Sequence, residues 1–442
     1  MSARAAVAPA RPRAGRAAGL AYAAVGAVIC VALYRWQGTG YWSYSDGVYA
    51  YTARAMLDGA GLYSGVAAAQ PPPTFWAGAL ALAPGESIET LRAGLALVTL
   101  ASGALVAAAV WRLTAHRVAA VAGGAGSLLA PWAVREHALL TPETFAAPLL
   151  MGAALLGARG GTAAVAGGAL GAGAGAFKLT WLVPAAAIAL VAADRRRFLA
   201  GAAGTGIVLG AVSLALYGGA LWDNIVTAQL QTGTQAPRLV LEYAEQAAWN
   251  LAPLAVLALL AMALRDRARD PALLRTLIAL ALGAAAILAT LGKDGSYVNV
   301  VVPVEPPLVA LGAAGVAWLW TGPGPARARG LRVVALAAVA LAGAQTASLL
   351  AAPDDPAVFR HPWAGDYYAR IAAPGEVDAR AARARRCEPG VPFSGPPYIA
   401  FVAGRSMPGN QGDPFIINRA DILASQLEAA RRDRPRCPAG RG

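Results

Sequence analysis

A carboxylate just after the first long apolar segment carries the clearest chemical signal in this chain. Asp46 lies in the run Trp-Ser-Tyr-Ser-Asp-Gly-Val-Tyr, residues 42–49. If the preceding apolar segment spans a membrane, Asp46 emerges at the water boundary, where it can stay ionised and contact both a lipid head group and a soluble acceptor. There it could act as a general base on an acceptor hydroxyl. The alternative is an N-cap for the helix predicted over Tyr49–Leu57.

Two lysines suggest a second kind of chemistry. Lys178 and Lys293 are the only lysines in a chain that otherwise uses arginine. A fixed cation stabilises the charge that develops on a departing phosphate, so both are candidates for binding a donor phosphate. Lys178 could equally be a residue at the end of a span whose amine reaches the surface. Asp294 could bind a sugar hydroxyl, or form a local ion pair with Lys293.

Glu143 follows Pro142 and is the remaining candidate acid. It could be a second catalytic acid or bind the sugar, or it could complement the dipole at the start of a helix. A divalent ion between Asp46, Glu143 and a donor phosphate is conceivable. However, no cluster of metal-ligand type stands out, and we predict neither a metal nor a resident cofactor.

The composition of the chain indicates an all-α polytopic membrane protein. The chain is 57% hydrophobic and 14% charged, whereas soluble domains carry about 25% charged residues. The net charge is +13, but the arginines fall in short gaps between apolar segments, so they indicate topology and not a nucleic-acid partner. No GxxxxGK[ST] motif is present, which argues against an ATP-driven pump.

Hydropathy predicts about eleven transmembrane helices. The first lies near residues 19–34, and the others near 88–111, 118–134, 139–158, 161–177, 179–193, 198–218, 248–264, 272–291, 299–320 and 331–351. Basic residues concentrate in alternate loops, which predicts a cytoplasmic N-terminus and an extracytoplasmic C-terminus in the plasma membrane.

Three long segments are then extracytoplasmic: a first outer loop over 35–87, a second over 219–247, and the tail. We predict a transmembrane domain over 1–351 and a C-terminal segment over 352–442, either a small α/β domain or partly disordered. A charged helix is expected over Asp378–Arg386, another near Ile422–Arg432, and a strand-like run over Tyr398–Val402. Cys387 and Cys437 could pair if that side is oxidising, and this alternative stays open.

Several motifs together resemble C-type membrane glycosyltransferases, closest to the group of protein O-mannosyltransferases and lipid A aminoarabinose transferases. The resemblance lies in the first outer loop, from Asp46-Gly-Val-Tyr49-Ala50 through Ala53–Leu57 and Leu62-Tyr63 to Gln70-Pro-Pro. It continues at Thr141-Pro142-Glu143, Phe177-Lys178 and Lys293–Asn299. The resemblance in topology covers residues 15–350, and the resemblance in local motifs is confined to about 46–76 and these short sites.

The resemblance implies a polyprenyl-phosphate sugar as donor and an extracytoplasmic glycan, lipid or protein as acceptor, usually with inversion at the sugar. It places Asp46 at the reacting centre and assigns donor binding to basic residues, with Tyr49 and Gln70 on the same loop. Two positions depart from the group. Gly47 stands where an acidic pair is common, and Gln70 stands where a lysine often precedes the proline pair.

We therefore predict a membrane glycosyltransferase with Asp46 and Glu143 as catalytic acids. Lys178, Lys293, Asp294, Gln70 and Tyr49 are the predicted donor-binding residues. The alternatives are a flippase or other transporter of lipid-linked glycans, and a non-catalytic subunit of envelope assembly. A transporter should carry charge near the membrane midplane, whereas these residues gather at one boundary. Nothing in the sequence selects between mannose and arabinose.

Overall fold

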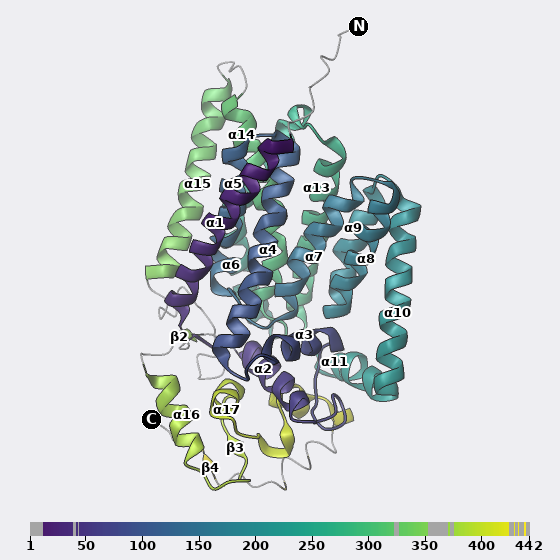
Figure 1. Ribbon diagram of the computed structural model, residues 1–442, viewed down its shortest axis with the longest axis vertical. Coiled ribbons are helices and arrows are strands. Elements are labelled where there is room, and N and C mark those ends of the chain that lie inside the picture. The colour runs from purple at the N-terminus through teal and green to yellow at the C-terminus, as the bar shows by residue number, and fades with distance from the viewer. Residues whose placement is uncertain are drawn as a thin grey trace.

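The computed structural model shows a bundle of long helices with a cap of shorter elements at one end (Figure 1). It describes residues 12–38, 41–42, 44–321, 327–351, 370–371, 375–423, 428, 432 and 437–438. The long bundle helices are α1 (Pro12–Gln37), α4 (Ile88–Thr114), α10 (Arg195–Trp222), α12 (Pro237–Ala263), α13 (Pro271–Ala286), α14 (Glu305–Thr321) and α15 (Arg327–Ala351). The shorter bundle helices are α5 (Arg117–Leu128), α6 (Pro131–Arg135), α7 (Pro142–Gly157), α8 (Gly161–Phe177) and α9 (Leu182–Val191).

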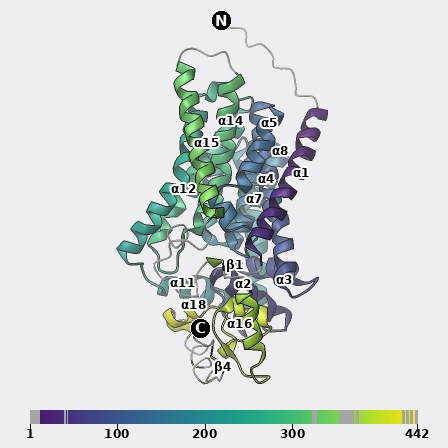
Figure 2. The same ribbon diagram turned by 90° about the vertical axis from the view of Figure 1, so that its left-hand side faces the viewer.

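The cap is built from the segment between α1 and α4, the segment after α10 and the C-terminal segment. Its helices are α2 (Tyr44–Leu57), α3 (Pro72–Leu82), α11 (Ala228–Gln231), α16 (Glu376–Arg385), α17 (Pro397–Ala403) and α18 (Pro414–Arg419). Strand β1 (Tyr41–Trp42) pairs antiparallel with β2 (Arg370–Ile371), and β3 (Phe393–Ser394) pairs parallel with β4 (Cys437–Pro438). In Figure 2 the C-terminal elements lie beneath α2 and α11, on the far side from the N-terminus.

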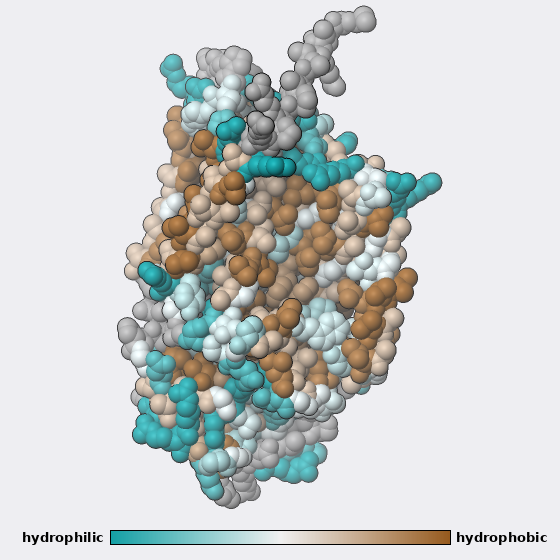
Figure 3. All heavy atoms as spheres, viewed as in Figure 1, coloured by the Kyte–Doolittle hydropathy of each residue, from teal (hydrophilic) through white to brown (hydrophobic). Residues whose placement is uncertain are grey.

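The chain is a multi-pass membrane protein. Within the described residues, seven helices are long and apolar enough to cross a bilayer. On the face shown in Figure 3, hydrophobic residues cover the middle of the bundle, and hydrophilic residues gather toward both ends. Each of the eleven predicted segments contains a helix, but those that contain α5, α7, α8 and α9 fall short of that length. The predicted count of eleven spans is therefore not confirmed.

Arginine-rich turns gather at the end of the bundle opposite the cap. Arg112 contacts Asp270, and the Arg269 amide donates to the Leu113 carbonyl at 3.1 Å. Arg267 donates to the carbonyl of Trp318. The turns after α4, α12 and α14 therefore lie together, and this end is separate from the cap, where the candidate residues for chemistry lie.

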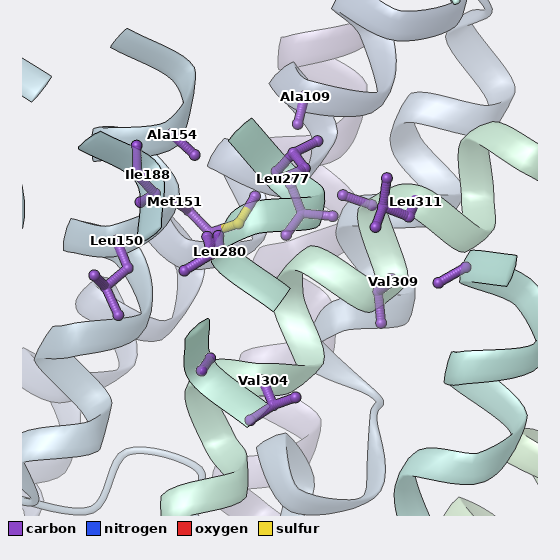
Figure 4. Packing of buried hydrophobic residues seen from close by; sticks show 14 of the residues in the cluster. Ala109, Leu150, Met151, Ala154, Ile188, Leu277, Leu280, Val304, Val309 and Leu311 are labelled. Carbon is purple, nitrogen blue, oxygen red and sulfur yellow. The ribbon is translucent and has the colours of Figure 1, made fainter. Parts of the chain in front are cut away.

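Small residues allow the bundle helices to pack closely. A Cβ added at Gly168 of α8 would lie 1.8 Å from the Phe198 carbonyl oxygen of α10, and one at Gly201 of α10 would lie 2.0 Å from the Val165 oxygen. These two helices therefore meet backbone to backbone, as small residues allow in lipid. Larger side chains such as Met151, Leu277 and Leu280 fill the space between the central helices (Figure 4).

Two predictions for the C-terminal segment have different outcomes. The predicted charged helix is present as α16. The strand-like run over Tyr398–Val402 is wrong, because these residues form helix α17, which Pro397 begins and Gly404 ends in the left-handed conformation. Its apolar side chains are buried in the cluster that also contains residues of α2. Tertiary packing and the two end residues thus override the local strand preference.

Cys387 is disulfide-bonded, and Cys30 is free and buried. The side chain of its predicted partner, Cys437, lies outside the described residues, as does most of the helix expected near 422–432.

Candidate active site

A polar cavity of about 400 Å³ lies where the cap meets the bundle. Its walls come from sequence-distant parts of the chain: α2, the loop before α3, the end of α6, the turn after α8, α11, α12, the turn after α13 and the C-terminal segment. The polar residues that line it are Tyr44, Ser45, Tyr49, Gln70, Glu136, Lys178, Thr180, Gln229, Gln235, Tyr243, Thr290, Lys293, Asp294, Ser296, Tyr297, Asn299 and Asp413. All five predicted donor-binding residues are among them.

The two lysines that are predicted to bind the donor phosphate line the same cavity. The Lys293 ammonium donates to Gln229 Oε1 at 2.6 Å and to Thr232 Oγ1 at 2.7 Å, and both partners are neutral. Burial and, to a smaller extent, repulsion from Lys178 together lower the pKa of Lys293 to about 8. An anion bound near both ammonium groups would reduce this repulsion.

Glu143 holds Lys178 in place. The Lys178 ammonium lies 2.8 Å from Glu143 Oε1, and the carboxylate is almost fully buried at the start of α7. The second oxygen, Oε2, has no hydrogen-bond partner within the described part of the chain. Glu143 is thus joined to the cavity through Lys178, although it is not among the residues that line it.

Asp46 is shielded from water. It is 0% exposed, its Oδ2 accepts from Arg92 at 2.7 Å, and its Oδ1 accepts from the Leu140 amide at 2.7 Å. Burial raises the pKa of Asp46, and the guanidinium and amide oppose that rise. The expectation that Asp46 is exposed to water is therefore wrong, because the cap covers α2. Asp46 joins α2 to α4 and to the residue before Thr141, and it does not line the cavity.

The packing of the cap explains why a glycine follows Asp46. A Cβ at Gly47 would lie 2.6 Å from the Tyr398 amide nitrogen and 3.0 Å from its Cα. Helix α17 therefore packs directly on α2 at this position. A side chain here, such as the second acid that the resembling group often carries, is excluded while α17 remains in contact.

Two acids on the cavity were missed as site residues. Glu136 is 5% exposed, its Oε1 has no hydrogen-bond partner among the described residues, and the nearest charge is Arg135 Nε at 3.8 Å. Burial raises the pKa of Glu136 to about 7. Asp413 reaches the cavity from the C-terminal segment, and burial raises its pKa as well. No pattern in the sequence singles out either residue. Glu136 directly follows Arg135, which suggests a local ion pair, and Asp413 lies in a segment without helical periodicity.

Three other predicted residues have defined partners. The Tyr49 hydroxyl is hydrogen-bonded to the Gln70 side chain, and the Gln70 carbonyl accepts from Tyr63 at 2.7 Å. Asp294 Oδ1 accepts from the Gly295 amide at 3.0 Å, within the turn that holds Lys293. These contacts fix the cavity wall on either side of the lysines. No group of metal-ligating side chains occurs among the residues described.

An apolar groove of about 440 Å³ adjoins the polar cavity. Its walls are α8, α9, α10 and the start of α3, and it shares Pro71, Leu179 and Ile225 with the cavity. Leu179 follows Lys178 directly, so the apolar groove meets the polar cavity beside a lysine. Helix α10, which forms one wall, is mostly exposed along its apolar length.

Comparison with known proteins identifies a fold. No family model and no curated protein matches the sequence. The crystal structure of ArnT from Cupriavidus metallidurans bound to undecaprenyl phosphate is similar with a TM-score of 0.65 and 15% identity, over 92% of this chain and 88% of that one. The apo structure gives a TM-score of 0.64 and 16% identity over the same shares. This chain has the ArnT fold. The resemblance to C-type membrane glycosyltransferases is thus confirmed as one of fold.

Proposed function

We propose that the chain is a membrane glycosyltransferase that moves a sugar from a polyprenyl-phosphate donor to an extracytoplasmic acceptor. One observation carries the proposal: two lysines line one cavity at the point where an apolar groove meets it. A polyprenyl-phosphate sugar has the matching parts, an apolar tail, an anionic phosphate and a polar sugar. ArnT, which shares the fold, has been crystallised with undecaprenyl phosphate.

In this proposal the donor phosphate lies between Lys178 and Lys293. Its negative charge relieves the repulsion between the two ammonium groups, so binding raises the lowered pKa of Lys293. The lipid tail lies in the groove along α8, α9 and α10, where it contacts the apolar side chains of these helices in place of other lipid chains. The sugar then occupies the polar part of the cavity near Tyr49 and Gln70, whose mutual hydrogen bond orients both side chains.

We assign the general base to Glu136 instead of Asp46. A base must lie within hydrogen-bond reach of the acceptor hydroxyl. Glu136 lines the cavity and its Oε1 accepts no hydrogen bond within the described residues, whereas both oxygens of Asp46 accept hydrogen bonds, from Arg92 and Leu140. We give Asp46 the role of positioning α2, and Glu143 that of orienting Lys178.

The proposed reaction is one displacement at the anomeric carbon. The acceptor hydroxyl gives its proton to Glu136 while its oxygen forms the new bond to the anomeric carbon. The bond between that carbon and the phosphate oxygen breaks, and its electron pair leaves with polyprenyl phosphate. Lys178 and Lys293 stabilise the charge that returns to the phosphate. Attack from the face opposite the phosphate inverts the anomeric centre.

The membrane orientation in this proposal follows the arginines. The arginine-rich turns lie in the cytoplasm, and the cavity and cap lie outside the plasma membrane. The acceptor is an envelope glycan, lipid or protein, and the sugar is a hexose or a pentose.

The test is sugar transfer in proteoliposomes that contain the purified chain and radiolabelled polyprenyl-phosphate sugars. Lys293→Met should lower transfer and the binding of polyprenyl phosphate together, because it removes one of the two phosphate contacts. Arg238→Met is the matched control, since Arg238 is 91% exposed on α12.

Three outcomes separate the proposal from its rivals. Label that moves to an acceptor and depends on Lys293 supports a transferase. Label that crosses the bilayer still attached to its lipid would support a flippase. A chain that binds polyprenyl phosphate but neither transfers nor moves any donor tried would support a non-catalytic subunit.

A further inference from the structure

Residues 405–415 of the C-terminal segment run antiparallel along α2 and are joined to it by a series of hydrogen bonds. Near the end of α2, Arg54 donates to the Phe401 carbonyl at 2.5 Å and to the Arg405 carbonyl at 3.0 Å. One turn earlier, the Tyr51 hydroxyl accepts from the Met407 amide at 2.9 Å. The segment therefore follows the helix back toward its first residue.

Two glycines make this contact close. Besides Gly47, which meets the Tyr398 backbone, Gly412 lies against α2, where an added Cβ would be 2.7 Å from Thr52 Oγ1. One glycine belongs to α2 and the other to the C-terminal segment. The backbone of α17 therefore meets α2 at Gly47, and the side chains of Tyr51 and Thr52 leave room only for a glycine at position 412 while they keep their present positions.

The segment ends at the cavity. The Tyr44 hydroxyl donates to Asp413 Oδ1 at 3.0 Å and accepts from the Phe415 amide at 3.1 Å. The Phe415 ring lies against Gly295, where an added Cβ would be 2.9 Å from Cε1, in the turn that carries Lys293. The C-terminal segment thus bridges the start of α2 and the turn of a donor-binding lysine.

We propose that the C-terminal segment is a working part of the site and that Asp413 accepts a hydrogen bond from a hydroxyl group of the transferred sugar. The inference rests on the proposed function. Asp413 lines the cavity, and a carboxylate has more acceptor capacity than the single Tyr44 hydroxyl and the backbone amides use. A sugar is the component of the donor that offers hydroxyl donors, and polyprenyl phosphate without a sugar offers none.

A purely structural role for Asp413 is the competing explanation. Its Oδ1 also accepts from the Ile416 amide at 3.2 Å and so caps α18. Asparagine caps helices as well as aspartate does, and its carbonyl oxygen still accepts from Tyr44. Asp413→Asn therefore keeps both structural contacts and removes the charge, so a structural role predicts no loss of activity.

The experiment compares Asp413→Asn with the native chain and with Asp421→Asn, which changes an exposed acid in the same segment. Sugar transfer, polyprenyl-phosphate binding and thermal unfolding are measured for each. Loss of one hydrogen bond to a charged group should lower kcat/KM for transfer by about tenfold to a hundredfold in Asp413→Asn. Polyprenyl-phosphate binding and the unfolding temperature should not change, and Asp421→Asn should behave as native.

Transfer by Asp413→Asn within about twofold of native, a difference smaller than that of one ordinary hydrogen bond, would overturn the inference and leave the proposed function standing. A drop in unfolding temperature or in polyprenyl-phosphate binding that accounts for the lost transfer would also overturn it, in favour of the structural role. A native chain that transfers no sugar would overturn the proposed function and this inference with it.

Discussion

The activity should depend on pH through two groups that face the cavity. Burial raises the pKa of Glu136 from 4.5 to about 7, so this carboxylate loses its proton only as the pH rises through that value. Burial and the nearby Lys178 lower the pKa of Lys293 from 10.5 to about 8, so this ammonium is lost above it. Transfer needs Glu136 ionised to accept a proton and Lys293 charged to bind phosphate, so its rate should rise and then fall with pH.

The size of the effect follows from these two values. Their midpoint places the maximum of kcat/KM near pH 7.5, and the fraction of chains in the active form falls about sevenfold by about pH 6 and by about pH 9. The parameter to measure is kcat/KM, because it reports the free enzyme, in which Lys293 has not yet met the phosphate.

Two substitutions should each abolish the decline in kcat/KM on one side of the pH optimum. Glu136→Gln should lower kcat/KM by about a hundredfold to ten thousandfold and abolish the rise on the acid side. Lys293→Arg should keep activity above pH 9, because a guanidinium stays charged beyond about pH 12. The assay is initial-rate transfer of labelled sugar in proteoliposomes across this pH range, with Glu242→Gln as a control on the outer part of α12.

The reasoning would be refuted by an acid-side decline that persists unchanged in Glu136→Gln. That result would mean that another group accepts the proton. An alkaline decline that persists in Lys293→Arg would likewise show that Lys293 does not set the charge needed for donor binding.

The remaining predictions concern stability. Asp46→Asn should destabilise the chain by about 3–5 kcal/mol in denaturant unfolding, because it leaves the Arg92 charge buried without its partner. Adding Arg92→Met should recover much of that loss, and an inactive Asp46→Asn variant of native stability would instead restore Asp46 as the base. Gly201→Ala should lower stability by about 1–3 kcal/mol through its contact with the Val165 carbonyl. Gly204→Ala, with no atom near its added Cβ, should not, and equal unfolding temperatures for the two would refute the close contact of α8 with α10.

The helices of the bundle could be predicted because each is encoded by its own apolar run. Lys178 and Lys293 could be singled out because they are the only lysines in the chain, and the structure places both on one cavity. Their role in donor binding stays a prediction. What could not be predicted is how deeply each residue is buried in the folded protein. The position of Asp46 along the chain says that it follows a span, but only the packing of α17 on Gly47 shows that the cap covers it.

The same limit explains the missed residues. Glu136 becomes a cavity residue because the turn after α6 faces the space beneath the cap, which no local pattern encodes. Asp413 reaches the cavity only because the C-terminal segment runs back along α2. The strand predicted over Tyr398–Val402 failed for a related reason, since its aromatic and branched residues favour a strand until Pro397 and the packing against α2 are taken into account.

The order in which the cavity is assembled has a consequence for biogenesis. Its walls extend from Tyr44 to Ile416, so the first outer loop leaves the ribosome long before the segment that closes over it. Until that segment has been synthesised and has reached the same side of the membrane, Gly47 and the cavity side of α2 have no cover. The bundle can fold from its N-terminal end during synthesis, but the site is completed last, so a nascent chain held in the translocon carries no finished cavity.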